Sequence, residues 1–427
     1  MLLLYSPNST IRLQYICKFI FEEILCTSYS LTIDEQTFIK DDGNKLNYSN
    51  TKIDNVFQIE AHAILFENNI QERAIKCFDY KTTKAFFKTE NADFPFDIFA
   101  ACFYLISRYE EYLPHTKDMY GRYAHENAIA FKENFIQQPV INIWLKYFKQ
   151  TLKEHFPSMV FKEKTFSYIP TYDIDMAYAY KEKGFLRNTG GFFKSPSIGR
   201  LSTLLGMSND PFDCYGFLDE LHEKNKLNPI YFFLVAKENG LYDKNILPDN
   251  EAMQSFIKMH AEKYTIGLHP SWKSFEAAEI LQEEKICLEN ITTTTIEKSR
   301  QHYIKMELPE TYKRLIAQNI LNDYSMGYGS INGFRASVAS SFFWFDLQEN
   351  KITKLRIHPF CFMDANSHYE QKQNINQTKE ELDYYYKTCA SLNVTLITIF
   401  HNSFLGSSKE FEGWSTLYKN FIAQLPQ

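Results

Sequence analysis

From about residue 165 onward, short apolar runs alternate with longer amphipathic stretches, and this rhythm constrains the fold more than any other feature. Alternating strand and helix units of this length are typical of a parallel sheet with crossover helices. Roughly six or seven such units favour an α/β barrel, complete or incomplete, over an open sheet. The expected strands are residues 166–173, 229–236, 264–269, 301–306, 354–363 and 393–401. The expected helices are residues 212–226, 251–263, 274–290, 309–323 and 379–392.

The first 160 residues have a mixed pattern instead, with a strand expected at the start of the chain and helices among the residues that follow. A chain of 427 residues is too long for one ordinary core. We therefore expect an N-terminal α+β accessory domain of unknown function over residues 1–160 and a barrel domain over residues 165–427. The expected N-terminal helices are residues 9–25, 96–114 and 138–157.

The polar end of the helix expected at 96–114 is interpreted as a solvated face, and no catalytic group is expected in this half of the chain. The residues concerned are Arg108, Glu110, Glu111 and Tyr112. Residues 183–200 contain several Gly and Ser residues, and we expect this segment to be a surface loop near the site.

Charge and composition exclude several classes of protein. The formal net charge is −6 and no basic run occurs, which argues against a nucleic-acid partner. The eight cysteines are scattered and indicate free thiols in a reducing compartment. The chain start lacks the basic and cleavage regions of a signal peptide, and no apolar run approaches the roughly 20 residues of a membrane span. We expect a cytoplasmic protein without a membrane span, whose oligomeric state the sequence leaves open.

Two carboxylates follow the strand expected at 166–173, in the sequence TYDID. Asp173 and Asp175 should point the same way, because alternate residues of a strand share a face. Like charges held together require a shared proton, a bound cation or exposure to water. His269 and His401 end two other expected strands, so all four side chains should meet at one edge of the sheet. Mixed nitrogen and oxygen ligands of this kind predict a site for a divalent ion such as zinc, or an acid–base site.

Other chemistries find no support in the sequence. No G-x-S-x-G motif for a serine nucleophile is present. No G-x-G-x-x-G motif or P-loop is present either, which argues against a nucleotide cofactor.

Four short motifs, in order, resemble those of the polysaccharide deacetylases of the NodB-homology class. They are TYDID, IGLHPSW, NGFRASVASSFFWFDL and ITIFHN, and they extend over about residues 165–405. The first 160 residues resemble the accessory region that precedes this domain in some uncharacterised bacterial members. The resemblance implies a distorted (β/α)7 barrel.

The resemblance also implies roles for individual residues. Asp173 would be the general base that activates water, and His401 the general acid that protonates the leaving amine. Asp175 and His269 would hold the metal ion, expected to be zinc. Arg335 would orient Asp173.

One position departs from the family pattern. The second motif of the family has another His four residues after the first, and here that residue is Lys273, which cannot ligate a metal when protonated. His302, in the polar run RQHY, is the best candidate for the third ligand or for a substrate contact. Asp364, with His358 and His368 near it, is a weaker candidate.

The function expected is removal of acetyl groups from an N- or O-acetylated carbohydrate, by a metal-dependent hydrolase acting on carbon–nitrogen bonds of linear amides. One alternative is a catalytically silent relative that binds carbohydrate, which the Lys273 departure motivates. The other is a metal-dependent amidohydrolase whose substrate is a non-sugar amide.

Overall fold

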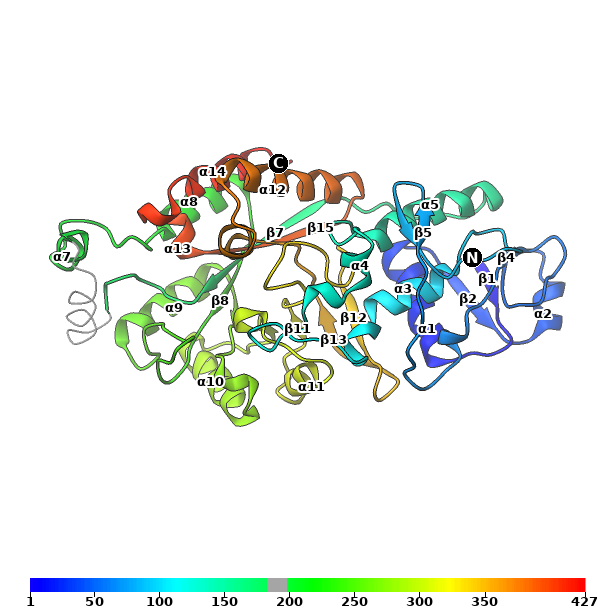
Figure 1. Cartoon of the computed structure of the whole chain (residues 1–427), viewed down its shortest axis with the longest axis horizontal. Coiled ribbons are helices and arrows are strands. Elements are labelled where there is room, and N and C mark those ends of the chain that lie inside the picture. Colours follow the sequence, from blue (N-terminus) through cyan, green and yellow to red (C-terminus); the bar gives the residue numbers. More distant parts are fainter. Residues whose placement is uncertain (183–197, 427) are drawn as a thin grey trace.

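The structure, a computed structural model, describes residues 1–182 and 198–426 (Figure 1). It contains a small sheet near the N-terminus and a large sheet in the remainder of the chain. Most of the segment for which a surface loop was expected, residues 183–200, lies outside the described residues. Among the described residues, no helix has the length and apolarity needed to cross a membrane.

The N-terminal region is built on a four-stranded sheet with the order β2-β1-β3-β4, and all of its strand pairs are parallel. The expectation of an α+β domain is therefore corrected to α/β, although a short antiparallel hairpin, β5-β6, lies beside the sheet. The strands are β1 Leu2–Tyr5, β2 Tyr29–Thr32, β3 Asn44–Tyr48, β4 Phe57–Ile59, β5 Phe78–Tyr80 and β6 Thr83–Ala85. The main helices are α1 Ile11–Cys17, α2 Glu35–Lys40, α3 Ile98–Ile106 and α5 Val140–His155.

The large sheet has nine strands in the order β12-β13-β11-β10-β9-β8-β7-β15-β14. Every pair in it is parallel except β12-β13, which is antiparallel. The strands are β7 Ser167–Ile174, β8 Ile230–Phe233, β9 Thr265–Leu268, β10 Lys298–Ser299, β11 Asn322–Asp323, β12 Phe342–Asp346, β13 Lys351–Ile357, β14 Phe362–Met363 and β15 Thr395–His401.

Crossover helices lie around this sheet, as the alternating pattern predicted (Figure 1). They are α8 Tyr215–Asn225, α9 Glu251–Lys263, α10 Ala278–Thr292, α11 Glu310–Ala317, α12 Ile375–Ser391 and α14 Trp414–Ala423. Shorter helices include α7 Ile198–Leu204 and α13 Asn402–Leu405.

The large sheet curls into an incomplete barrel. Strands β13 and β14 lie toward opposite ends of the row, yet only residues 358–361 connect them. So short a connection spans at most roughly 18 Å, which brings the two ends together. A separate apolar cluster fills the inside of the curl, with buried side chains from β8, β14 and β15. Within the described residues β13 and β14 do not pair, so the ring stays open there.

Two strand predictions are wrong in an informative way. The strand expected at 301–306 is a turn: β10 ends at Ser299, and Tyr303 and Ile304 have positive φ angles of 58° and 53°. A strand cannot contain such residues because left-handed backbone reverses the extended chain. The strand expected at 354–363 is two strands, β13 and β14, separated at His358 and Pro359.

The N-terminal region packs against the β12-β13 end of the large sheet. The rings of Tyr15 and Phe103 lie 5.1 and 5.2 Å from that of Phe345, and the Tyr15 hydroxyl donates to the Phe343 carbonyl at 2.6 Å. One apolar core runs through both parts as a result. The domain boundary near residue 160 stays a prediction.

A buried ion network joins the two parts. Glu111 Oε1 accepts from Arg108 Nε at 2.7 Å and from Arg335 Nε at 2.8 Å, and Oε2 accepts from Arg335 Nη2 at 2.6 Å. All three side chains are at most 3% exposed. The interpretation of this helix end as a solvated face is therefore wrong for Arg108 and Glu111. Every residue of α3 is buried, and Ser107, Arg108 and Glu111 after it are buried too, whereas Glu110 and Tyr112 are half-buried.

Replacing Glu111 by Gln is expected to lower the free energy of unfolding by about 3 kcal/mol, because it leaves two guanidinium groups buried without their carboxylate. Burial alone would raise the pKa of Glu111, but Arg335 and Arg108 lower it from 4.5 to about 2. The ion network thus contributes fully above pH 4.5 and is lost as the pH falls towards 2.

Urea denaturation followed by circular dichroism at pH 7 and at decreasing pH measures both effects. The stability difference between wild type and Glu111→Gln should shrink as the pH falls, since a protonated Glu111 resembles Gln. Glu154→Gln, at an exposed position on α5, is the control and should match wild type. Equal stability of wild type and Glu111→Gln at pH 7 would contradict the assigned network.

Candidate active site

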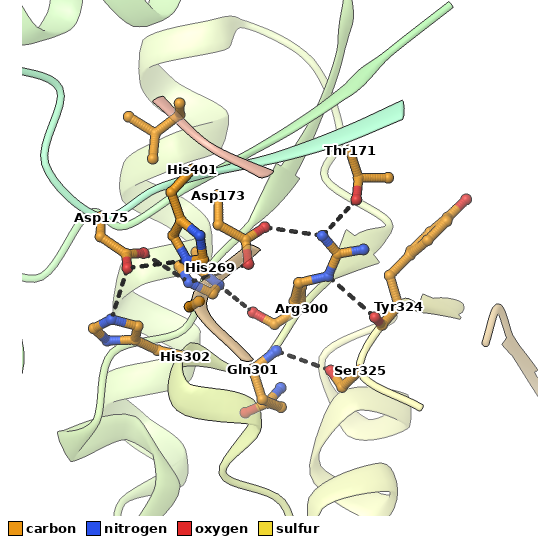
Figure 2. A network of polar contacts seen from close by, with 12 residues as sticks. Thr171, Asp173, Asp175, His269, Arg300, Gln301, His302, Tyr324, Ser325 and His401 are labelled. Atoms are coloured by element: carbon orange, nitrogen blue, oxygen red, sulfur yellow. Dashed lines mark hydrogen bonds and ion pairs between the residues drawn. The ribbon is translucent and has the colours of Figure 1, made fainter. Parts of the chain in front are cut away.

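Parallel strands bring the predicted residues to one edge of the barrel. Asp173 lies in β7 beside His401, the last residue of β15, and the two are register partners. Asp175 follows β7 directly, and His269 follows β9. These are the carboxyl ends of neighbouring parallel strands, where functional side chains of α/β barrels gather. The structure therefore brings together the four residues that the strand ends predicted (Figure 2).

His269 is oriented by the backbone of another strand end. Its Nδ1 lies 2.6 Å from the carbonyl oxygen of Arg300, which can only accept, so Nδ1 carries the hydrogen. Nε2 then faces Oδ1 of Asp175 at 3.0 Å with a lone pair. Such a contact to one imidazole nitrogen is how proteins fix the other as a metal ligand.

His302 is oriented in the same way by a carboxylate. Its Nδ1 lies 2.9 Å from Oδ1 of Asp243, and its Nε2 lies 3.5 Å from Oδ2 of Asp175. Both His302 and Asp243 are buried. The carboxylate–histidine arrangement holds the ring and leaves Nε2 to point at Asp175. His302 is therefore in the place proposed for it, although it lies in a turn and not in a strand.

As a consequence, Asp175, His269 and His302 direct acceptor atoms at one point. The Asp175 carboxylate and the Nε2 atoms of His269 and His302 provide ligand atoms that all lie within 4.8 Å of one another. Among the described residues, Oδ1 of Asp175 is buried without a hydrogen bond. Lone pairs facing one another are unfavourable unless protons or a cation lie between them. One oxygen and two nitrogen donors fit a divalent ion such as zinc.

The charge balance of this cluster agrees with a cation site. Burial would raise the pKa of Asp175, but His302 and His269 hold it well below its usual range. Burial lowers the pKa of His302, and Asp175 and Asp243 raise it to about 9. The cluster therefore stabilises positive charge at the His302 ring, and a bound ion would supply such charge without the proton.

Arg300, and not Arg335, contacts Asp173, which corrects the expectation from the sequence. Arg300 Nη1 lies 2.9 Å from Asp173 Oδ1 and donates to Thr171 Oγ1 at 2.6 Å. The guanidinium is fully buried, and the ring of Phe232 lies 4.5 Å from it. Arg335 is held by Glu111 in the buried network described above. The second oxygen of Asp173 lies 3.8 Å from His269 Nε2, beside the cluster.

His401 is paired with a carboxylate that sequence reasoning had placed in another role. Its Nδ1 lies 2.6 Å from Oδ1 of Asp364, and its backbone N–H donates to Oδ2 of Asp364 at 2.6 Å. Nε2 lies 3.6 Å from Asp175 and faces the cluster. Burial lowers the pKa of His401, but Asp364 in particular raises it to about 10. His401 is thus set to carry a proton on Nε2 at neutral pH.

The remaining candidates lie away from the cluster. Lys273 is exposed and pairs with Glu238, so its charge does not enter the site. His358 stacks on Tyr324 at 4.4 Å and His368 packs against Phe411 at 5.4 Å. Neither belongs to the group of residues that could hold a metal ion.

A cavity of about 470 Å³ opens over these residues, a size suited to a small ligand. Asp173, Asp175, His269, His302 and His401 all line it. Sequence reasoning missed four further residues of the site or its support: Arg300, Asp243, Tyr120 and Arg122. Arg300 belongs to the polar run that singled out His302, so the signal for it was present.

The comparisons with known proteins assign no activity to this chain. Residues 2–157 match the model of a family of unknown function, DUF7033. The search of curated proteins gave no match.

Solved structures with a similar fold include a protein from Mycobacterium smegmatis named as a polysaccharide deacetylase, at 13% identity and a TM-score of 0.41, covering 62% of this chain and 84% of that one. An allantoinase matches at 11% identity with a TM-score of 0.39, and the match covers 61% of this chain and 83% of that one. A polysaccharide deacetylase from Bacillus cereus matches at 9% identity with a TM-score of 0.32, and the match covers 61% of this chain and 88% of that one. The chemistry of the site rests on its own side chains.

Loss of a ligand side chain is expected to weaken metal binding strongly. Wild-type protein should bind about one equivalent of zinc, and Asp175→Asn or His302→Ala should weaken this by roughly 100-fold or more, because each removes one of three donors. Mass spectrometry of the metal content and competition against a chelating dye measure the effect. Lys273→Ala is the control and should bind zinc like wild type. Zinc binding that survives in His302→Ala would place the third donor elsewhere.

Asp243 should matter for metal affinity without touching the ion. Asp243→Asn keeps a hydrogen-bonding side chain but loses the charge that holds His302, so zinc affinity should fall about 10- to 100-fold. The same dye competition measures it. Asp249→Asn, at an exposed position a few residues along the chain, is the matched control. Unchanged affinity in Asp243→Asn would show that the 2.9 Å contact does not position the ring.

Proposed function

We propose that the protein is a metal-dependent hydrolase that removes an acetyl group from an N- or O-acetylated carbohydrate. The observation that carries the proposal is the convergence of three ligand atoms on one point, with Asp173 and His401 beside it in the same cavity. Each of these five side chains has a partner that fixes its orientation or charge. The motif resemblance described from the sequence is the reason for choosing acetyl transfer to water among the reactions that such a site supports.

Asp173 is the proposed general base. Arg300 Nη1 donates to Asp173 Oδ1 and also to the Thr171 hydroxyl, so this oxygen of the carboxylate is fixed by the guanidinium. Oδ2 of Asp173 is thereby left to accept a proton from water next to His269 Nε2, 3.8 Å away. When bound by Asp175, His269 and His302, a divalent ion would polarise the acetyl carbonyl and lower the pKa of water.

His401 is the proposed general acid. Asp364 accepts from Nδ1, which directs the second nitrogen, Nε2, towards the cluster and the cavity. The proton on Nε2 can then pass to the departing amine or alcohol as the bond to the acetyl carbon breaks. The base and the acid lie on neighbouring strands and flank the ligand cluster, which is the arrangement that hydrolysis of an amide or ester requires.

Aromatic side chains in the cavity support a carbohydrate as the substrate class. Tyr303, Tyr369 and Phe404 line the cavity together with the polar residues, and aromatic rings are a common surface for the apolar face of a sugar. A non-sugar amide is the alternative substrate. The two are distinguished by a panel of N-acetylglucosamine oligomers, O-acetylated xylooligosaccharides and small acetamides. Turnover of the acetamides alone would contradict the carbohydrate assignment.

Asp173→Asn should keep zinc but lose activity, because it removes the base without removing a ligand. We expect kcat to fall by about 10²- to 10⁴-fold in Asp173→Asn and in His401→Gln. Acetate release from the active member of the panel measures kcat, and metal content is measured on the same samples.

The control for this comparison is Lys273→Ala, whose kcat should equal that of wild type. If Asp173→Asn loses zinc as fully as Asp175→Asn does, the two aspartates share one role and the proposed division is wrong. Zinc-loaded wild type that hydrolyses nothing in the panel would favour the catalytically silent alternative.

A further inference from the structure

The N-terminal region supplies part of the cavity wall. Tyr120 and Arg122 line the cavity together with the ligand residue His302. Both belong to residues 2–157, the region matched by the family of unknown function. The cavity is therefore shared between the barrel and a region to which no role has been given.

A tight turn presents these two residues. Lys117 and Tyr123 form an antiparallel bridge, and Gly121 has a φ of 75°, a conformation that favours glycine. Asp118 organises the turn: Oδ1 accepts from the backbone N–H groups of Tyr120 and Arg122, both at 2.9 Å, and Oδ2 accepts from Arg122 Nε at 2.6 Å. We refer to residues 117–123 as the wall loop.

The wall loop is fixed to the barrel next to a ligand residue. Arg122 Nη1 donates to the carbonyl oxygen of Tyr303 at 2.8 Å, and Lys117 Nζ lies 2.8 Å from Glu307 Oε1. The Arg122 side chain is only 6% exposed. Gly329 makes room for this contact, because a Cβ there would lie 2.0 Å from Arg122 Nη1. The contact is thus specific, and it fixes the residue that follows His302.

Aromatic rings continue from the wall loop to the ligand cluster. The ring of Tyr120 lies 5.4 Å from that of Tyr303, and the ring of Tyr303 lies 4.7 Å from that of His302. Behind them Tyr242 stacks on Trp272 at 3.9 Å, and Tyr120 lies 6.2 Å from each. Tyr303 is 36% exposed and lines the cavity with Tyr120. A supported aromatic surface therefore begins at the ligand cluster and extends outward.

We propose that Tyr120, presented by the wall loop, and Tyr303 bind one face of a pyranose ring of the substrate. The axial C–H groups of such a ring form an apolar face, which packs on aromatic rings while the hydroxyls stay in water. Held there, the ring places a neighbouring acetyl group at the ligand cluster. The N-terminal region is then a specificity element of the active site. This inference rests on the proposed carbohydrate substrate.

The test compares Tyr120→Ala, Tyr120→Leu and Tyr120→Phe in zinc-loaded full-length protein. With N-acetylglucosamine tetramer or the acetylated xylooligosaccharide that is turned over, KM should rise about 10-fold in the Ala and Leu variants while kcat stays within about twofold. The Phe variant keeps the ring and should behave like wild type. Tyr384→Ala removes an exposed tyrosine from α12 and is the control. Zinc content and Tm are recorded for all, and Leu serves if Ala fails to fold.

Two outcomes of the KM comparison, and one further measurement, separate this inference from the proposed function. Wild type that turns over a sugar, with KM unchanged in folded Tyr120→Leu, would overturn the inference and leave the function standing. A KM in Tyr120→Phe as high as in Tyr120→Ala would also overturn it, since the ring is retained. Calorimetric binding of the same sugars decides the case without turnover: weaker binding in Tyr120→Leu supports the inference, and no binding by wild type overturns it together with the function.

Discussion

The site depends on a convergence of hydrogen-bond acceptors around one carboxylate. His269 gives its Nδ1 hydrogen to a backbone carbonyl and His302 directs its Nδ1 at Asp243, so both Nε2 atoms turn towards Asp175. A buried arrangement of this kind is stable only if positive charge occupies its centre. The contacts of His269 with the Arg300 carbonyl and of His302 with Asp243 hold each ring in the orientation that a metal ligand needs. The repulsion between the two neighbouring aspartates is offset in two ways: Arg300 pairs with Asp173, and the rings of His269 and His302 face Asp175.

The curled sheet brings the site residues close together. Strands β7, β9 and β15 end at the same edge and deliver Asp173, His269 and His401 by parallel register alone. His302 needs something further, because β10 is short and its chain must turn back into the cavity. That turn includes two positive φ angles at Tyr303 and Ile304, a conformation that costs free energy and persists only where neighbours fix it. Arg122 of the N-terminal region is one of those neighbours.

The sequence was sufficient for the strand-end residues and insufficient for their partners. Alternating apolar runs located β7, β9 and β15 closely, and with them Asp173, His269 and His401. The partners of these residues are set by tertiary contacts that no local pattern encodes. Arg335 and Arg300 are both buried arginines, and only the three-dimensional structure shows that Glu111 takes the first and Asp173 the second. The polar end of α3 was misjudged for the same reason, since its burial depends on the packing of the N-terminal region against the barrel.

One short segment, residues 300–303, makes four of the contacts on which the site relies. The Arg300 guanidinium holds Asp173, and its carbonyl orients His269. His302 contributes a candidate metal ligand, and the Tyr303 carbonyl accepts a hydrogen bond from Arg122. Lys273 is exposed and offers no donor to the cluster, whereas His302 offers one from a different loop, because a nitrogen donor needs only the right position and orientation. This segment contacts Asp173, orients His269, contains His302 and forms part of the cavity wall, so a change that shifts it should disturb all of them together.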